Sequence, residues 1–311
     1  MGKIAFIFAG QGAQYPGMMK EMYDSIPESR EIFNKADEIL DRDITRLCFE
    51  GPQESLNLTE NTQPCVYTAD MAAYAAILSH GINAEGFAGF SLGEYAALTA
   101  AGFISFGDCL RVVQTRAKAM QSAVPVGSGA MVVTGTKDRD LLNKTISDVT
   151  SGYLVAANYN SPDQVVLSGT VEAVDEFISL ALQRKIKAMK LAVSAPFHCE
   201  LMRPAASSID EALSNLELFD TISPIYMNVD GNPQKKMDRI IENIKVQVYS
   251  PLQWHRTIEN MILDGYDLFV ELGPGKALTG FNKKISSGIT TLRFGTMAEL
   301  EEVVRSLKKK D

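Results

Sequence analysis

The chain has 311 residues and a net charge of −8, and its composition is 46% hydrophobic and 22% charged. This composition predicts a globular protein with a substantial core, and no run approaches the roughly 20 apolar residues of a membrane span. The negative charge argues against nucleic-acid binding, which normally requires a basic face. Four scattered cysteines indicate neither a disulfide framework nor a zinc site, so we expect a cytoplasmic protein.

Apolar runs alternate with amphipathic helical stretches, which predicts an α/β protein with a mostly parallel sheet. The apolar run near the N-terminus is too short for a secretory signal and indicates a buried first strand. In chain order, we expect a strand at residues 3–9, a helix at 63–79, a strand at 84–90, a helix at 92–101 and a late strand at 269–272.

The middle of the chain has a different order of elements. We expect a strand at residues 130–135, a helix at 139–149, strands at 153–158 and 164–168, a helix at 171–184 and a strand at 188–193. The order β-α-β-β-α-β is that of the ferredoxin-like motif. We therefore predict a small ferredoxin-like subdomain at residues 125–195. It would be inserted into a large α/β subdomain formed by residues 1–124 and 196–311.

A candidate nucleophile lies between an expected strand and an expected helix. Gly89-Phe90-Ser91-Leu92-Gly93 fits G-x-S-x-G, in which a sharp turn presents the serine hydroxyl at the head of a helix. Free backbone N–H groups there favour a developing oxyanion. Five residues match by chance often, and a glycine-lined helix start is the alternative; the strand-helix context favours catalysis.

A serine hydroxyl needs a base to become a nucleophile, and the chain has three histidines. His80 lies at an expected helix C-terminus, where a histidine complements the helix dipole. His255 follows Trp254 at the start of a helical stretch and fits packing or surface. His198 follows a strand at the expected subdomain junction, where a cleft would lie. Elimination favours His198, although its spacing fits a structural histidine equally well.

Seven separated motifs resemble the malonyl-CoA:acyl carrier protein transacylases, in the order found in that family and over nearly the whole chain. The family implies an α/β-hydrolase-like large subdomain with a ferredoxin-like insertion, as expected above. The motifs are Phe8-Ala9-Gly10-Gln11-Gly12, Asn61-Thr62-Gln63-Pro64, Gly89-Phe90-Ser91-Leu92-Gly93-Glu94, Gln114-Thr115-Arg116, Asn160-Ser161-Pro162, Pro196-Phe197-His198 and Ser250-Pro251-Leu252-Gln253-Trp254.

The resemblance implies roles for individual residues. Ser91 would be the nucleophile and His198 its general base. The backbone N–H groups of Gln11 and Leu92 would form the oxyanion hole, and Arg116 would hold the malonyl carboxylate. Further implied roles are polar site-lining residues at Gln63 and Asn160, a bulky wall at Phe197, and a main-chain carbonyl at Gln247 that orients His198 in place of an Asp.

Two residues depart from the family pattern. Phe90 stands where the family usually has His, so any hydrogen bond from that position is missing. Cys199 replaces the Ser commonly found after the base. A thiol beside His198 could be reactive, but a small side chain filling a small gap is the simpler interpretation.

The resemblance implies an enzyme that transfers malonyl from malonyl-CoA to the pantetheine thiol of holo acyl carrier protein, for fatty-acid biosynthesis. Taken alone, Arg116 would be one more surface arginine of a helix; with the family pattern, its guanidinium fork suits a carboxylate. The chemistry requires no metal and no cofactor. We expect a monomer that binds neither nucleic acid nor membrane.

An acidic carrier would seek basic residues near the cleft mouth. One candidate patch is Arg184, Lys185, Lys187 and Lys190, and the other is Lys276, Lys283 and Lys284. Solvated surface charge is the alternative for both patches.

Rival functions differ in pathway or chemistry. A trans-acting acyltransferase of a polyketide synthase, or of malonate decarboxylation, would share every motif. A serine esterase or thioesterase would need an acid between nucleophile and base, and the acids there, such as Asp163 and Asp175, lie in or beside the predicted insertion. A non-catalytic carrier-binding scaffold would need none of Ser91, His198 and Arg116.

Overall fold

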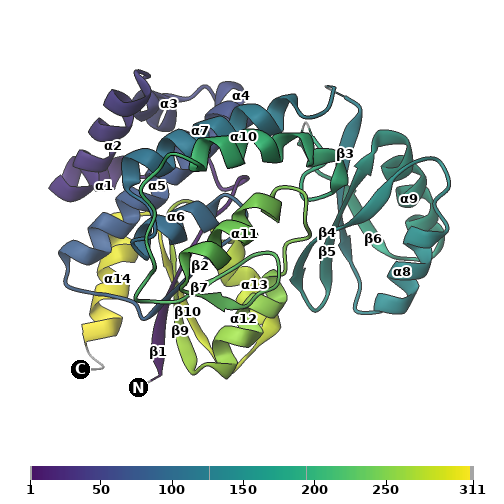
Figure 1. Ribbon diagram of the computed structural model, residues 1–311. Coiled ribbons are helices and arrows are strands. Elements are labelled where there is room, and N and C mark those ends of the chain that lie inside the picture. The colour runs from purple at the N-terminus through teal and green to yellow at the C-terminus, as the bar shows by residue number, and fades with distance from the viewer. Residues whose placement is uncertain (1, 126, 194, 309–311) are drawn as a thin grey trace.

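The computed structural model describes residues 2–125, 127–193 and 195–308. Two sheets organise the chain, and helices surround both (Figure 1). Sheet A is mainly parallel, and sheet B is antiparallel, which confirms the predicted α/β class with a ferredoxin-like insertion. No helix in these three ranges is long and apolar enough to span a membrane.

Sheet A has the strand order β10-β9-β1-β2-β7-β8, and all its pairs are parallel except β7 with β8. Its strands are β1 (Lys3–Phe8), β2 (Gly86–Gly89), β7 (Ile225–Tyr226), β8 (Pro233–Gln234), β9 (Tyr266–Leu272) and β10 (Thr290–Phe294). Alternate residues of β1 enter different cores: Phe6 and Phe8 join the larger cluster, whereas Ala5 and Ile7 pack on the other face. Both faces are therefore buried, as parallel sheets require.

Helices cover both faces of sheet A (Figure 1). The helices outside the segment of sheet B are α1 (Lys20–Ser25), α2 (Pro27–Leu40), α3 (Ile44–Glu50), α4 (Gln53–Leu56), α5 (Thr59–Ser79), α6 (Gly93–Ala100), α7 (Phe106–Ser122), α10 (Pro204–Leu213), α11 (Met237–Gln247), α12 (Trp254–Leu263), α13 (Ala277–Ile285) and α14 (Met297–Lys308). Some of these helices pack on other helices, as α2 and α3 do on α5. A short 3₁₀ turn, η1 (Glu200–Met202), precedes α10.

Sheet B has the order β4-β5-β3-β6, and every neighbouring pair is antiparallel. Its elements are β3 (Gly129–Gly135), α8 (Arg139–Ser147), β4 (Leu154–Ser161), β5 (Gln164–Thr170), α9 (Val171–Gln183) and β6 (Lys187–Lys190). Helices α8 and α9 lie on the outer side of this sheet (Figure 1), and their apolar faces form a separate core with it.

A short backbone connection ties sheet B to the loop before α12. The Tyr159 N–H of β4 donates to the Leu252 carbonyl at 2.8 Å, and the Leu252 N–H donates to the Ala157 carbonyl at 2.7 Å. The boundary at residues 125–195 stays a prediction. Val126 and Ser194, which lie one residue inside the two predicted ends, are outside the described residues.

Helix α5 begins at Thr59, four residues before the predicted start. Pro64 lies inside the helix and cannot donate to the Glu60 carbonyl. The Gln114 side-chain amide of α7 donates to that carbonyl instead, at 3.4 Å. Proline is typical of the first turn of a helix, but here the helix continues before it, because a side chain of α7 supplies the missing hydrogen bond.

Candidate active site

Ser91 lies at the sharp turn between β2 and α6, with a left-handed φ of 54°. The turn leaves no room for a side chain at Gly89 or Gly93. A Cβ on Gly89 would overlap the Gly93 carbonyl, and a Cβ on Gly93 would overlap the Phe8 carbonyl. Since a non-glycine residue at positive φ is strained, the turn needs support. The Asn228 side chain gives it by accepting from the Ser91 N–H at 2.8 Å.

His198 lies beside the nucleophile, with Ser91 Oγ 2.7 Å from its Nε2. Its other ring nitrogen, Nδ1, is 3.0 Å from the Gln247 main-chain carbonyl. Because a carbonyl only accepts, Nδ1 carries the proton and Nε2 presents a lone pair to Ser91. Burial, and then the Arg116 charge, lower the pKa of His198 to about 4. The imidazole is therefore a neutral base at neutral pH.

Arg116 is fully buried, in contrast to the surface position expected from α7 alone. Its Nη1 donates to Gln63 Oε1 at 2.8 Å, and its Nη2 lies 3.2 Å from Ser91 Oγ and 3.1 Å from Gln247 Oε1. The Tyr95 ring lies 5.2 Å from the guanidinium. No described carboxylate lies within ion-pair distance of Arg116. The nearest buried acid in its hydrogen-bond network is Glu94, which is connected to it through Gln247, so the guanidinium beside the nucleophile has only neutral hydrogen-bond acceptors.

Gln63 does not line the cavity, contrary to its predicted role. It is fully buried and holds Arg116 from behind. Its amide nitrogen lies 3.4 Å from Gln11 Oε1, and the Gln11 amide donates to Thr59 Oγ1 at 3.2 Å. This chain of amides connects the loop after β1 to the arginine.

The backbone N–H groups of Gln11 and Leu92 lie on the two segments that flank Ser91. Neither group donates a hydrogen bond to another described residue. The two segments are in close contact, since a Cβ on Gly10 would overlap the Phe90 carbonyl. Two free donors in such a place suit a developing oxyanion.

A cavity of about 620 Å³ opens at Ser91 and His198, between the two sheets. One wall comes from sheet B and includes Val133, Asn158 and Asn160, and the other comes from the start of α13 and includes Lys276 and Phe281. Phe197 also lines the cavity, and its role as a bulky wall stays a prediction. The side-chain oxygens of Asn158 and Asn160 are buried, and neither has a hydrogen-bond partner among the described residues. A donor on a ligand could pair with these oxygens after a rotation of the side chains that brings them to the cavity surface.

Three polar groups of the site were not found from the sequence. Asn228 follows β7, and its amide nitrogen also donates to the Gly89 carbonyl at 2.7 Å. Glu94, in the first turn of α6, is buried and accepts from the Asn228 N–H at 2.7 Å and from Gln247 Nε2 at 2.6 Å. The third group is the Gln247 side chain, which connects Arg116 to Glu94. The resemblance implies a role only for the main-chain carbonyl of this residue.

The two departures from the family pattern have structural explanations. Phe90 packs edge-on against Trp254, with ring centroids 5.7 Å apart, and lies 6.0 Å from Phe281, so an aromatic cluster stabilises the position. The Cys199 thiol is buried and donates to the Pro196 carbonyl at 3.1 Å. Burial raises the pKa of Cys199, which fits a packing role and not a reactive thiolate.

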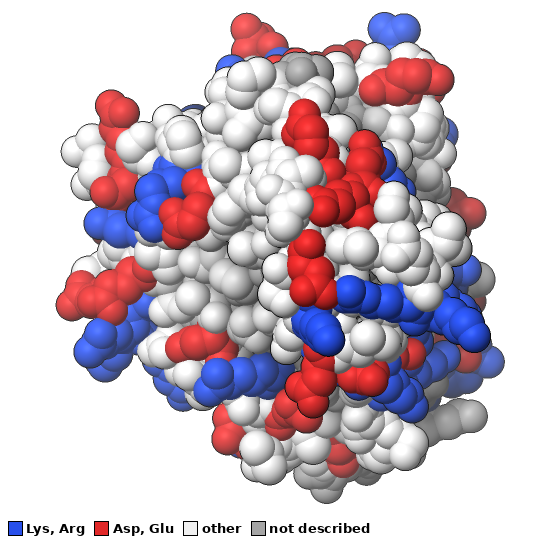
Figure 2. Space-filling model, turned by 90° about the vertical axis from the view of Figure 1, so that its right-hand side faces the viewer, with Lys and Arg blue, Asp and Glu red and all other residues white. Residues whose placement is uncertain are grey.

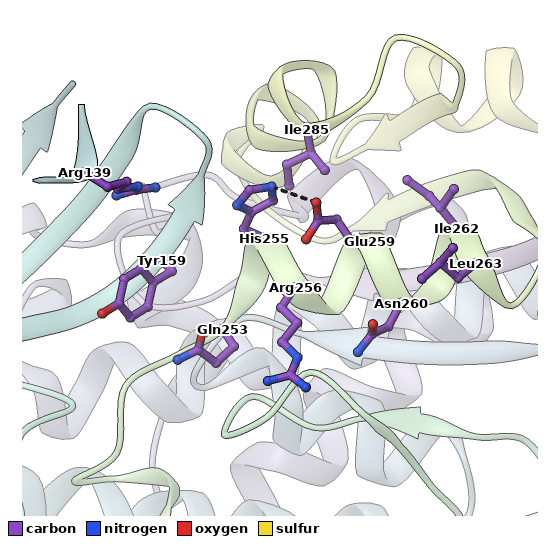
Figure 3. Close-up of a pocket in the computed structure, with 10 residues that line it drawn as sticks. All are labelled: Arg139, Tyr159, Gln253, His255, Arg256, Glu259, Asn260, Ile262, Leu263 and Ile285. Atoms are coloured by element: carbon purple, nitrogen blue, oxygen red, sulfur yellow. Dashed lines mark ion pairs between the residues drawn. The ribbon is translucent and has the colours of Figure 1, made fainter. Parts of the chain in front are cut away.

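A second hollow, of about 650 Å³, lies between Arg139 and Tyr159 on one side and α12 on the other (Figure 3). His255 lines it and lies 3.3 Å from Glu259, its neighbour one helical turn away. None of the ten lining residues is Ser, Thr or Cys, so His255 has no nucleophile to activate. The third histidine, His80, is directed at the Ala76 carbonyl at 2.9 Å.

Comparison with known proteins adds to this geometry. The acyl transferase domain family matches residues 5–308. A malonyl CoA-acyl carrier protein transacylase of Bacillus subtilis (strain 168) is 39% identical over 100% of this chain and 99% of its own. The chain belongs to this transacylase family.

Solved structures of the family agree in fold. The malonyl CoA-acyl carrier protein transacylase of Clostridium perfringens superposes with a TM-score of 0.95 at 39% identity, covering 99% of this chain and 98% of that one. A malonyl-transacylase bound to a type II polyketide synthase acyl-carrier protein superposes with a TM-score of 0.94 at 34% identity, covering 98% and 99%. Family membership makes the protein an acyltransferase and excludes the esterase interpretation and the scaffold.

Proposed function

We infer that this acyltransferase moves the malonyl group of malonyl-CoA to the pantetheine thiol of holo acyl carrier protein, for fatty-acid biosynthesis. The reaction is of the ping-pong type and passes through malonyl-Ser91. The observation that carries the site assignment is a serine-histidine pair at 2.7 Å with an unpaired, buried arginine 3.2 Å from the same oxygen. An esterase has no use for that arginine.

In the first half-reaction, Ser91 Oγ attacks the thioester carbonyl while His198 Nε2 accepts the hydroxyl proton. The carbonyl oxygen becomes an oxyanion, and the N–H groups of Gln11 and Leu92 donate to it. The carbon–sulfur bond then breaks, coenzyme A leaves as a thiol with the proton from His198, and malonyl stays on Ser91 as an ester.

The second half-reaction reverses these steps with a different thiol. His198 accepts the proton of the carrier's pantetheine thiol, and the sulfur attacks the malonyl ester. When the carbon–oxygen bond breaks, Ser91 recovers its proton from His198. The Gln247 carbonyl accepts from Nδ1–H in both the neutral ring and the imidazolium, and so orients the ring in the place of a triad acid.

Arg116 accounts for the preference for malonyl. A malonyl carboxylate would replace Ser91 Oγ as an acceptor for Nη2, whereas Gln247 Oε1 keeps its hydrogen bond to the same nitrogen. The site would then exchange a neutral acceptor for a charged one, and a charge-assisted hydrogen bond is about twice as strong as a neutral one. An acetyl group offers no such acceptor.

The cavity wall suits a pantetheine arm. Such an arm carries amide N–H groups, and the side-chain oxygens of Asn158 and Asn160, which line the cavity, have no partner among the described residues. Val133, Val166 and Phe281 add apolar surface to the lining of the same cavity. These residues would hold the arm in its extended form and direct its thiol to Ser91.

The carrier's docking surface stays a prediction with two candidates. In the first patch, Arg184 pairs with Asp148, and Lys190 pairs with Asp175 at 2.7 Å; blue and red side chains are interspersed over this face (Figure 2). In the second patch, Lys284 pairs with Asp163, but Lys276 lines the catalytic cavity itself. We propose the second patch, because it adjoins the point where the arm enters.

A polyketide role is the second candidate, because a structural neighbour is bound to a polyketide synthase carrier protein. The site chemistry is identical, so only the carrier distinguishes the pathways. The monomeric state and the cytoplasmic location also stay predictions.

The test of the function is the product balance with purified holo carrier protein. We expect malonyl-carrier and free coenzyme A to form in equal amounts, with almost no free malonate, since the site is built to admit a thiol. Mass spectrometry of the carrier and a thiol assay measure the two products, and apo carrier without its arm is the control. Free malonate as the main product would contradict the proposal.

A further inference from the structure

Glu94 is a buried carboxylate to which the reaction steps above assign no role. It lies 1% exposed in the first turn of α6 and forms no ion pair with a described residue. Its two oxygens have different partners: Oε1 accepts from the Asn228 N–H, and Oε2 accepts from Gln247 Nε2. Burial raises the pKa of Glu94 to about 7, against these hydrogen bonds, which lower it.

The partner of Oε2 is the residue that connects the base to the arginine. The amide nitrogen of Gln247 donates to Glu94 Oε2 at 2.6 Å and to the Ser91 carbonyl at 2.8 Å. Both of its N–H bonds are then used, so Oε1 lies on the opposite side and accepts from Arg116 Nη2 at 3.1 Å. The main chain of the same residue orients His198.

An amide side chain can turn over and exchange its oxygen and nitrogen at little cost, unless its partners accept in one orientation only. Glu94 is such a partner, because both of its oxygens face donors, the Asn228 N–H and the Gln247 amino group, and therefore both accept. With Glu94 on one side, Gln247 has to direct its nitrogen toward α6 and its oxygen toward the guanidinium. The reversed amide would place two donors against each other at Arg116.

We propose that Glu94 is a positioning residue for malonyl recognition: it fixes the Gln247 amide so that Arg116 is held with its fork beside Ser91. The inference rests on the proposed malonyl transfer. Glu94 is not a catalytic acid or base, because no hydrogen bond joins it to Ser91 Oγ or to His198, whose two ring nitrogens have other partners.

The Glu94→Gln variant tests this proposal with almost no change of shape. A glutamine has one accepting oxygen. If that oxygen faces the Asn228 N–H, its amino group meets the amino group of Gln247, which must then turn over and present N–H to Arg116. We expect kcat/KM for malonyl-CoA to fall at least about tenfold more than kcat/KM for acetyl-CoA.

Asp70→Asn is the matched control. Asp70 is also fully buried, and its oxygens have no hydrogen-bond partner among the described residues. The same exchange of a buried carboxyl group for an amide there should leave the malonyl-to-acetyl ratio unchanged. If the ratio fell equally in Asp70→Asn and in Glu94→Gln, the loss would be a general effect of changing a buried carboxyl group, and the proposal would be overturned.

A double-mutant cycle tests whether Glu94 acts through Gln247. Gln247→Ala removes the amide and keeps the main-chain carbonyl for His198, so it should lose the same malonyl preference. Adding Glu94→Gln to Gln247→Ala should then lower the ratio no further. Additive losses in the double variant would overturn the proposal. An unchanged malonyl-to-acetyl ratio in Gln247→Ala would also overturn it, and this measurement can be made even if Glu94→Gln does not fold. Failure of the wild type to charge the carrier would instead contradict the function.

Discussion

Replacing His198 by alanine is expected to slow the acylation of Ser91 by malonyl-CoA by roughly 10³- to 10⁶-fold. The imidazole is the only described base within hydrogen-bond distance of Ser91 Oγ. The other neighbour, Arg116, is a cation and cannot accept a proton. Rapid-quench mass spectrometry of the acyl-enzyme measures the rate.

His255→Ala is the control for this variant. His255 lies on α12 in the second hollow, paired with Glu259 (Figure 3), so its loss should change the acylation rate less than about twofold. A His198→Ala variant that keeps a tenth or more of the wild-type rate would contradict the assignment of the base.

Replacing Arg116 by alanine is expected to reverse the acyl preference. For malonyl-CoA, we expect kcat/KM to fall roughly 30- to 5,000-fold. This corresponds to an activation free energy that is higher by about 2–5 kcal/mol, as when a buried charge loses its partner. Transfer of acetyl should fall much less, because acetyl has no carboxylate. Competition between the two donors, read from the mass of the carrier product, gives the ratio directly.

Arg116→Lys separates charge from shape. Lysine keeps the positive charge but has no planar fork, so it cannot hold Gln63 and Gln247 while it binds a carboxylate. We expect an intermediate ratio. Equal losses of malonyl and acetyl transfer in Arg116→Ala would contradict the role of the arginine.

The elements next to the nucleophile were predictable because their signals are local. The G-x-S-x-G turn predicts both a strand before Ser91 and a helix after it, and the structure has β2 and α6 there. The order of elements in the insertion was predictable for the same reason, since each strand and helix has its own hydrophobic period.

The burial of Arg116 could not be predicted from α7 alone. An arginine in an amphipathic helix is normally exposed, and what buries this one is a set of distant partners, Gln63 and Gln247 among them. Only the resemblance to the family indicated its role. Gln63 belongs to one of the family motifs, so its importance was predictable. Its position behind Arg116 was not, because it depends on how α5 packs against α7.

Asn228 and Glu94 were missed because their roles depend on contacts between segments 134 residues apart. Neither residue type is distinctive by itself, since Asn is common after strands and Glu is common in the first turn of helices. One signal for Glu94 is its position in the mostly apolar helix α6, one residue after Gly93 of the G-x-S-x-G turn. A carboxylate that is buried there requires hydrogen-bond donors.

The most direct test of the account is intact-protein mass spectrometry after brief mixing with malonyl-CoA, followed by holo acyl carrier protein. The account predicts a single malonyl adduct on the wild type and none on Ser91→Ala, and it predicts that the carrier removes the adduct faster than water does. An adduct on Ser91→Ala, or one lost at the same rate without the carrier, would contradict a covalent transfer through Ser91.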